Sequence, residues 1–163
     1  MLLNLLCFIL AFIHGSFAEY WAHRWMHMFP RLGRDLVPHY RHHKENYGQG
    51  VLLEFKDYAL LVPLSLVALF ISVPVGISII LGSLLYAAFS AYAHQLQHEN
   101  PVKCFWLKMP VHYVHHKYNQ WDCNFGLAVD WWDRLFGTYK PVDWLGEAEL
   151  KRSHKGCLDV RWW

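Results

Sequence analysis

The uncharged stretch from Tyr58 to Ala93 constrains the fold more than any other feature. It contains no charged residue and no histidine. One transmembrane helix needs about 20 apolar residues, so this stretch is too long for one span and just long enough for two. Pro74 and Gly76 lie at its middle, where a hairpin would turn. We therefore predict transmembrane helices at about residues 57–72 and 76–99.

The amino-terminal segment predicts a further span at about residues 2–23, with the sequence "MLLNLLCFILAFIHGSFAEYWAH". A signal peptide is the alternative, because Ser16-Phe17-Ala18 has the small-x-small pattern of a cleavage site. The segment lacks a basic n-region and includes His14 and Glu19. We therefore expect it to be retained as a helix.

The basic residues predict how the spans are oriented. All fifteen Lys and Arg residues lie within 24–56 and 103–161. By the positive-inside rule, both blocks face the cytoplasm. We predict an all-α integral membrane protein with one multi-pass domain over 1–163. It has about three transmembrane helices, and a histidine-rich helical cap lies on the cytoplasmic side.

Charge and cysteine content exclude several classes of protein. A formal net charge of +2 with no basic run argues against nucleic acid as a partner. The four cysteines are scattered without a C-x-x-C motif, which argues against a disulfide framework and against a thiolate zinc site.

Ten of the twelve histidines fall into a repeated order of pair, triplet, pair, triplet. The pairs have the pattern H-x-x-x-H in "HRWMH" and "HQLQH", and the triplets have the pattern H-x-x-H-H in "HYRHH" and "HYVHH". The four groups are His23 and His27; His39, His42 and His43; His94 and His98; and His112, His115 and His116. His14 and His154 fit no group.

The spacing and the predicted topology would bring the four groups together. On a helix, residues i, i+3 and i+4 share one face, so each group can direct its imidazoles one way. Both pairs end a span that runs inward, and both triplets follow on the cytoplasmic side. All ten side chains can therefore converge at the membrane edge.

Ten converging imidazoles indicate two metal ions. Neutral imidazole suits Fe, Zn, Cu and Ni, and one ion takes about four to six ligands. A structural zinc needs only four ligands, so two irons able to bind O2 explain the number better. Copper and zinc stay open on ligand type, and zinc is a possible substitute in purified protein. Haem is disfavoured, because the core of the spans holds only His14.

Four polar residues are predicted to support the ligands. Glu19 lies four residues before His23, and we expect its carboxylate to orient a ligand histidine, since metal-bound imidazoles usually donate their other N–H. Asp130 and Asp133 are similar candidates, although Asp133 can equally pair with Arg134 or cap a helix. Asn124 can reach a metal directly or through water, or it can be a plain turn residue.

The four histidine groups, followed by "NFG" and "WWDRLFGTYKP", resemble the fatty acid hydroxylase / sterol desaturase superfamily over about residues 19 to 141. The resemblance implies an integral-membrane non-haem di-iron enzyme that hydroxylates or desaturates a lipid with O2. It implies that the ten grouped histidines carry the metals. The first pair has the sterol-desaturase spacing H-x-x-x-H, and the chain is shorter than most relatives.

The resemblance also implies a partner. The sequence has no cytochrome b5-like domain, flavin fingerprint or cysteine cluster. We therefore expect an external electron donor of cytochrome b5 or ferredoxin type, with its reductase. Two alternatives stay open: a zinc-dependent membrane lipid hydrolase that activates water, and a membrane metal-binding protein without catalysis.

Overall fold

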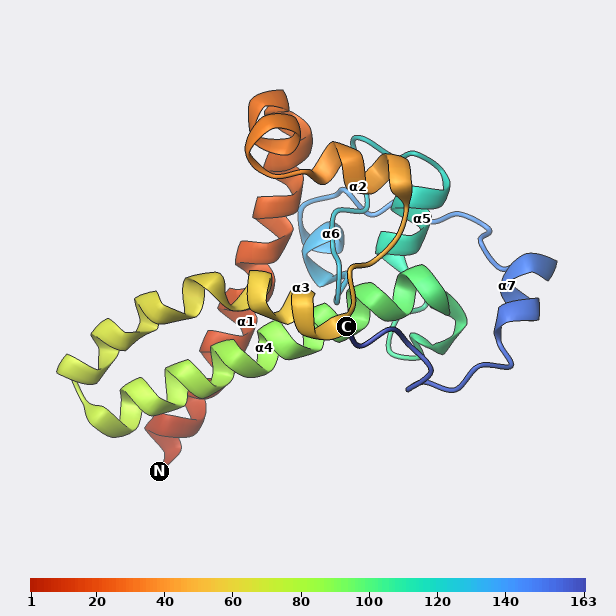
Figure 1. Ribbon diagram of the computed structural model, residues 1–163. Coiled ribbons are helices and arrows are strands. Elements are labelled where there is room, and N and C mark those ends of the chain that lie inside the picture. The colour runs from red at the N-terminus through yellow and green to blue at the C-terminus, as the bar shows by residue number, and fades with distance from the viewer.

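Two long apolar helices form the frame of the fold. In the computed structural model, which describes residues 1–163, α1 spans Leu2–Met28 and α4 spans Val73–Glu99. They pack against each other, and Figure 1 shows α1 crossing behind α4. Gly82 permits this close approach, because a Cβ there would lie 2.3 Å from the carbonyl oxygen of Phe8. There is no strand, so the predicted all-α class is confirmed.

A second helical arm lies beside α4 and forms a hairpin with it (Figure 1). It consists of α3 (Val51–Tyr58), which runs directly into a 3-10 helix at Ala59–Phe70. Pro63 lies inside the 3-10 helix. It has no N–H and cannot make an α-helical hydrogen bond to the preceding turn. The hairpin turns before Val73, and Pro74 lies in the first turn of α4, where a missing N–H is tolerated.

Two helices, α1 and α4, are long and apolar enough to cross a membrane. The predicted spans 2–23 and 76–99 lie within these longer helices. The predicted span 57–72 differs, because most of it is the 3-10 helix rather than an α-helix. At a rise of about 2.0 Å per residue, this helix extends about 24 Å, against about 18 Å for an α-helix of equal length. Its apolar side chains are largely exposed.

The remaining helices are short and gather near the carboxyl ends of α1 and α4, with α7 at the outer edge (Figure 1). They are a π-helix at Arg31–Leu36, α2 (His39–Glu45), a 3-10 turn at Pro101–Lys103, α5 (Val111–Lys117), α6 (Trp131–Leu135) and α7 (Glu147–Arg152). Leu96 of α4 and Val111 and Val114 of α5 are fully buried in one apolar cluster. This cluster fixes α5 against α4.

Glu149 ties α7 to α5. Its carboxylate accepts hydrogen bonds from the Tyr113 hydroxyl, from Lys117 Nζ at 2.9 Å and from the Gly146 N–H at 2.9 Å. These donors lower the pKa of Glu149 from 4.5 to about 2, with the Tyr113 hydrogen bond as the largest cause. A carboxyl whose pKa is depressed in the folded state stabilises that state above its unfolded pKa and ceases to do so as pH falls through its folded pKa.

We expect the wild-type protein to lose stability relative to Glu149→Gln as pH falls from about 4.5 to about 2. The measurement is the free energy of unfolding of both proteins in detergent, taken across this pH range. A difference between the two proteins that does not change with pH would contradict the assignment.

Candidate metal centre

Ten histidine side chains meet where the ends of α1 and α4 lie near α2 and α5. His23 and His27 lie near the end of α1, and His94 and His98 lie in the last two turns of α4. One triplet lies on α2 and the other on α5. Because the members of each group are three or four residues apart, each helix presents its imidazoles on one face.

Five of these side chains form a first group. The members are His23, His27, His39, His43 and His115, and one ring nitrogen from each lies within 4.8 Å of all the others. The Nε2 atom of His27 lies 2.8 Å from Nε2 of His39, 3.2 Å from that of His43 and 3.0 Å from that of His115. Helices α1, α2 and α5 therefore share this group.

The other five form a second group beside the first. Ring nitrogens of His42, His98, His112 and His116 lie within 4.8 Å of one another. Nε2 of His98 lies 3.2 Å from Nε2 of His112 and 3.3 Å from Nε2 of His94. Nε2 of His94 also lies 3.2 Å from that of His42. Helices α2, α4 and α5 share this group, with His94 at its edge.

Each triplet is divided between the two groups. In α2, His39 and His43 belong to the first group and His42 to the second. In α5 the division is reversed, because His115 belongs to the first group while its neighbour His116 belongs to the second. The rings of His43 and His116 stack at 4.1 Å between centroids, where the groups adjoin. The two triplets thus join both groups into one centre.

Hydrogen bonds fix the tautomers of several rings. Nδ1 of His23 donates to the carbonyl oxygen of Phe125 at 2.6 Å, and Nδ1 of His115 donates to that of Cys123 at 2.8 Å. Nδ1 of His42 lies 3.1 Å from the Tyr47 carbonyl oxygen. A carbonyl oxygen only accepts, so each of these Nδ1 atoms carries the proton. The Nε2 atom of each ring is then left with a free lone pair.

Free lone pairs therefore face one another in the interior of both groups. Burial is the main cause that lowers the pKa of His42 to about 2 and of His115 to about 3, so both rings are neutral at physiological pH. Burial likewise lowers the pKa of His39, His112 and His116. Two neutral Nε2 acceptors 3.2 Å apart cannot form a hydrogen bond with each other.

The donor sets fit a metal ion in each group. Neighbouring ligand atoms about an ion with bonds of about 2.0–2.1 Å are separated by about 2.8–3.4 Å in octahedral or tetrahedral geometry. The observed Nε2 separations of 2.8 to 3.3 Å agree with these values. Nε2 of His23 and both ring nitrogens of His116 are buried without a hydrogen-bond partner. Imidazole is a ligand for Fe, Zn, Cu and Ni, so such an ion would satisfy Nε2 of His23 and one of the two His116 nitrogens.

The predicted contact between Glu19 and a ligand histidine is wrong. The Glu19 carboxylate instead accepts a hydrogen bond from the Ser90 hydroxyl of α4, and it lies 3.2 Å from the Leu127 N–H and 3.4 Å from the Ala128 N–H. Glu19 is one helical turn from His23, but its side chain is directed to α4 and to the loop before α6. It joins these two segments to α1 one helical turn before His23.

Asp133 reaches His23 of the first group only through the main chain. It is fully buried, and its oxygens accept hydrogen bonds from the Phe125 N–H at 2.8 Å, the Gly126 N–H at 2.7 Å and the Thr138 hydroxyl at 2.7 Å. The carbonyl of Phe125 in turn accepts from His23. Asp133 therefore holds the loop that orients His23, without a contact to the ring itself.

Asn124 and Asp130 do not reach the centre. Asn124 has a left-handed backbone with φ of 57°, and its side chain bonds Gln120 and both main-chain polar groups of Lys140. It is therefore a turn residue, which is one of the two roles predicted for it, and it does not reach a metal position. Asp130 pairs with Arg134 at 2.7 Å, so its predicted support of a ligand is wrong.

Two buried supports escaped the sequence analysis. Glu54 of α3 hydrogen-bonds Nδ1 of His94 at 2.5 Å, and it lies just before the predicted apolar hairpin, where no motif marks it. Gln97 is fully buried, accepts from the His112 N–H at 3.0 Å and donates to the Leu127 carbonyl. The main-chain carbonyls of Phe125 and Cys123, which orient His23 and His115, cannot be recognised from the amino-acid sequence.

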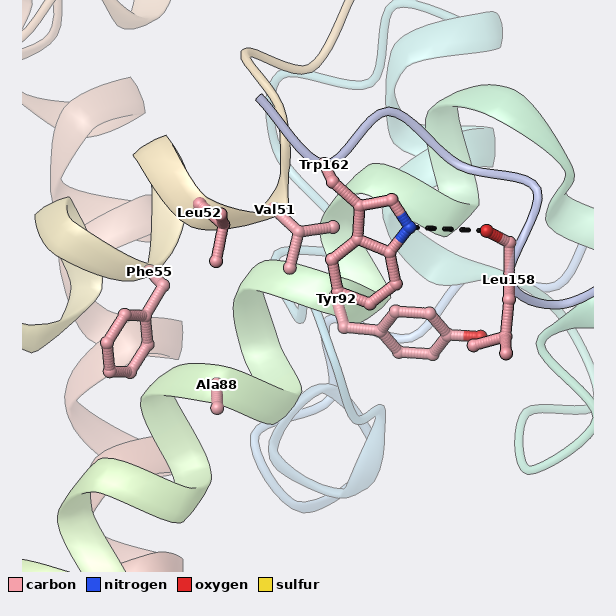
Figure 2. A pocket seen from close by; sticks show the side chains of 7 residues that line it. All are labelled: Val51, Leu52, Phe55, Ala88, Tyr92, Leu158 and Trp162. Carbon is pink, nitrogen blue, oxygen red and sulfur yellow. Dashed lines mark hydrogen bonds between the residues drawn. The ribbon is translucent and has the colours of Figure 1, made fainter.

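The two ungrouped histidines and an apolar surface groove lie away from the centre. His14 and His154 are exposed and belong to neither group. A groove of about 490 Å³ lies between α3, α4 and the residues near Leu158 and Trp162. Figure 2 shows the side chains that line it. Its lining is entirely hydrophobic and includes none of the ten histidines.

Comparison with known proteins identifies one family. The sequence model described as "Fatty acid hydroxylase" matches residues 8–138, which is most of the chain and includes every grouped histidine. No curated protein and no solved structure matches the chain.

Proposed function

The chain belongs to the fatty acid hydroxylase family, and from this premise we propose that it is a membrane di-iron oxidoreductase that uses O2 to hydroxylate or desaturate a lipid. The family supports a lipid-modifying oxidoreductase in a membrane, and the two apolar helices agree with that setting. Iron, two metals per chain and the reaction itself are our proposals.

One observation carries the proposal. Two adjoining groups of imidazoles direct their Nε2 atoms inward at 2.8 to 3.3 Å. No proton joins Nε2 of His42 to Nε2 of His94, because each of these rings donates its Nδ1 proton to an oxygen. The five histidines of the first group would hold one iron, and the five of the second group, His42, His94, His98, His112 and His116, would hold the other. Bound iron supplies redox chemistry that can activate O2 with two electrons for attack on an unactivated C–H bond.

The chain's own residues would shape this chemistry in two ways. The carbonyls of Phe125 and Cys123 keep His23 and His115 in the tautomer whose Nε2 is free. The apolar surfaces of α1, α4 and the 3-10 helix keep the lipid next to the centre, because they are exposed where a bilayer would contact them.

We further propose one domain over 1–163 with three membrane crossings, the 3-10 helix at Ala59–Phe70 being part of the second. The basic residues support a cytoplasmic position for the histidine centre. Electrons would come from an external donor of cytochrome b5 or ferredoxin type with its reductase. A nucleic-acid partner is not proposed.

We expect lipid extracts from cells that express the gene to contain a product absent from cells without it. Hydroxylation gives a mass gain of one oxygen, from RH + O2 + 2e⁻ + 2H⁺ → ROH + H2O. Desaturation gives a loss of two hydrogens, with both oxygen atoms leaving as water. Growth under isotopically heavy O2 separates the outcomes, because only a hydroxylated product carries the label.

A different result would point to another activity. Lipid cleavage without O2 uptake, with zinc as the bound metal, would replace the proposal by a zinc-dependent hydrolase. Bound metal with no change in any lipid would leave a metal-binding protein without catalysis.

A further inference from the structure

Glu54 is held at the second histidine group from two sides. It lies on α3 and is 4% exposed. Its Oε2 atom lies 2.5 Å from Nδ1 of His94, and its Oε1 atom accepts the Gln49 N–H at 2.8 Å. Each carboxylate oxygen therefore has its own hydrogen-bond donor, and the two hydrogen bonds together fix the orientation of the side chain.

The segment before α3 fits closely around this carboxylate. A Cβ at Gly48 would lie 2.1 Å from Oε1 of Gln95 and 2.9 Å from Oε1 of Glu54, so a larger residue there would displace these two side chains. The Gly50 N–H donates to Oε1 of Gln95 at 2.9 Å. The segment is thus fixed to α4 beside His94, and it fixes Glu54 in turn.

Glu54 differs in kind from the other groups that accept an Nδ1 proton in the centre. His23, His42 and His115 donate to neutral main-chain carbonyls, whereas His94 donates to a carboxylate. A hydrogen bond to an ionised acceptor is stronger than one between neutral groups. It also makes the imidazole a more basic ligand. The histidine that donates to a carboxylate belongs to the second group.

Resting on the proposed metal centre, we propose that Glu54 is a positioning residue that makes His94 a ligand of the second metal. By accepting the Nδ1 proton it leaves Nε2 of His94 free, 3.2 Å from Nε2 of His42 and 3.3 Å from Nε2 of His98. Without it, the second group retains only the four histidines that lie within 4.8 Å of one another. The second metal then depends on α3, an element that carries no histidine.

Replacing Glu54 by glutamine would reverse the tautomer. The amide has one oxygen, which can accept the Gln49 N–H, and its NH2 group then faces Nδ1 of His94. Facing a donor, Nδ1 becomes the acceptor and the proton moves to Nε2. A protonated Nε2 cannot bind a metal, although size and packing are almost unchanged.

The test is the metal affinity of the full-length protein in detergent, measured for iron by competition with a chelator. We expect Glu54→Gln to weaken one of two iron sites by about 10- to 100-fold and to leave the other at its wild-type affinity. Glu54→Asp, which keeps the carboxylate, should recover part of the loss. The matched control is Asp57→Asn, an exposed carboxylate on the same helix, which should bind both irons as the wild type does.

A double-mutant cycle separates the proposed path from a general effect on folding. In a His94→Ala background, Glu54→Gln should cause no further loss of iron affinity. An equal loss in both backgrounds, or two unaltered sites in Glu54→Gln, would overturn the role of Glu54 while leaving the proposed function standing. A wild-type protein that binds no iron would instead contradict the proposed function.

Discussion

Replacing His115 or His116 by alanine is expected to abolish activity together with one metal. The two residues are adjacent in sequence but belong to different groups. His115 is fully buried, and its Nε2 atom lies 3.0 Å from that of His27 and 3.2 Å from that of His43. His115→Ala should therefore empty the first group, and His116→Ala should empty the second.

Activity should fall by more than about 100-fold in either variant, because losing even an outer partner of a metal ligand lowers activity or affinity by about 10- to 100-fold. Iron content and turnover are measured on the same purified sample. His154→Ala is the control, since His154 is exposed in the carboxyl-terminal segment. Loss of a metal in His154→Ala would contradict the division into two groups.

Of all the substitutions proposed, replacing Asp133 by alanine is expected to lower the free energy of unfolding most. The change leaves the N–H groups of Phe125 and Gly126 buried without their acceptor, whereas the Thr138 hydroxyl keeps the Tyr20 hydroxyl as a partner. Each unsatisfied buried group costs about 1–3 kcal/mol, so the free energy of unfolding should fall by about 3 kcal/mol or more. The first metal should bind more weakly as well, because the Phe125 carbonyl no longer has a fixed place from which to orient His23.

Asp130→Ala provides the matched comparison for Asp133→Ala. Asp130 lies three residues before Asp133 and pairs only with the half-exposed Arg134. Its loss should change the free energy of unfolding by less than about 1 kcal/mol. Thermal unfolding in detergent and iron content are measured for both variants. Equal effects of the two substitutions would show that the loop is not held by Asp133.

The histidines could be grouped from the sequence because helical spacing fixes which side chains share a face. The spacing of "HYRHH" and "HYVHH" predicted two convergent triplets, but not that each triplet would divide between two groups. That division depends on how α2 and α5 face each other, which is a tertiary property. Likewise, the long apolar segments predicted the hairpin, whereas the 3-10 helix around Pro63 was not predicted.

The supports of the ligands were predicted less well, for a physical reason. Proximity along a helix suggested that Glu19 would serve His23, yet its carboxylate is used by Ser90 of α4. The carboxylate that does contact a grouped histidine belongs to Glu54, which is 40 residues from His94 in sequence. His23 and His115 are oriented by main-chain carbonyls, which every residue has, so the residue types give no sign of them.

Mössbauer spectroscopy on purified protein made with isotopically enriched iron tests the central claim most directly. We predict two spin-coupled irons per chain in imidazole environments, held by the two groups of histidines. The same sample should consume O2 when given a reduced electron donor and lipid. Protein that holds only zinc when made with excess iron, and that consumes no O2 with any lipid and donor, would contradict the account.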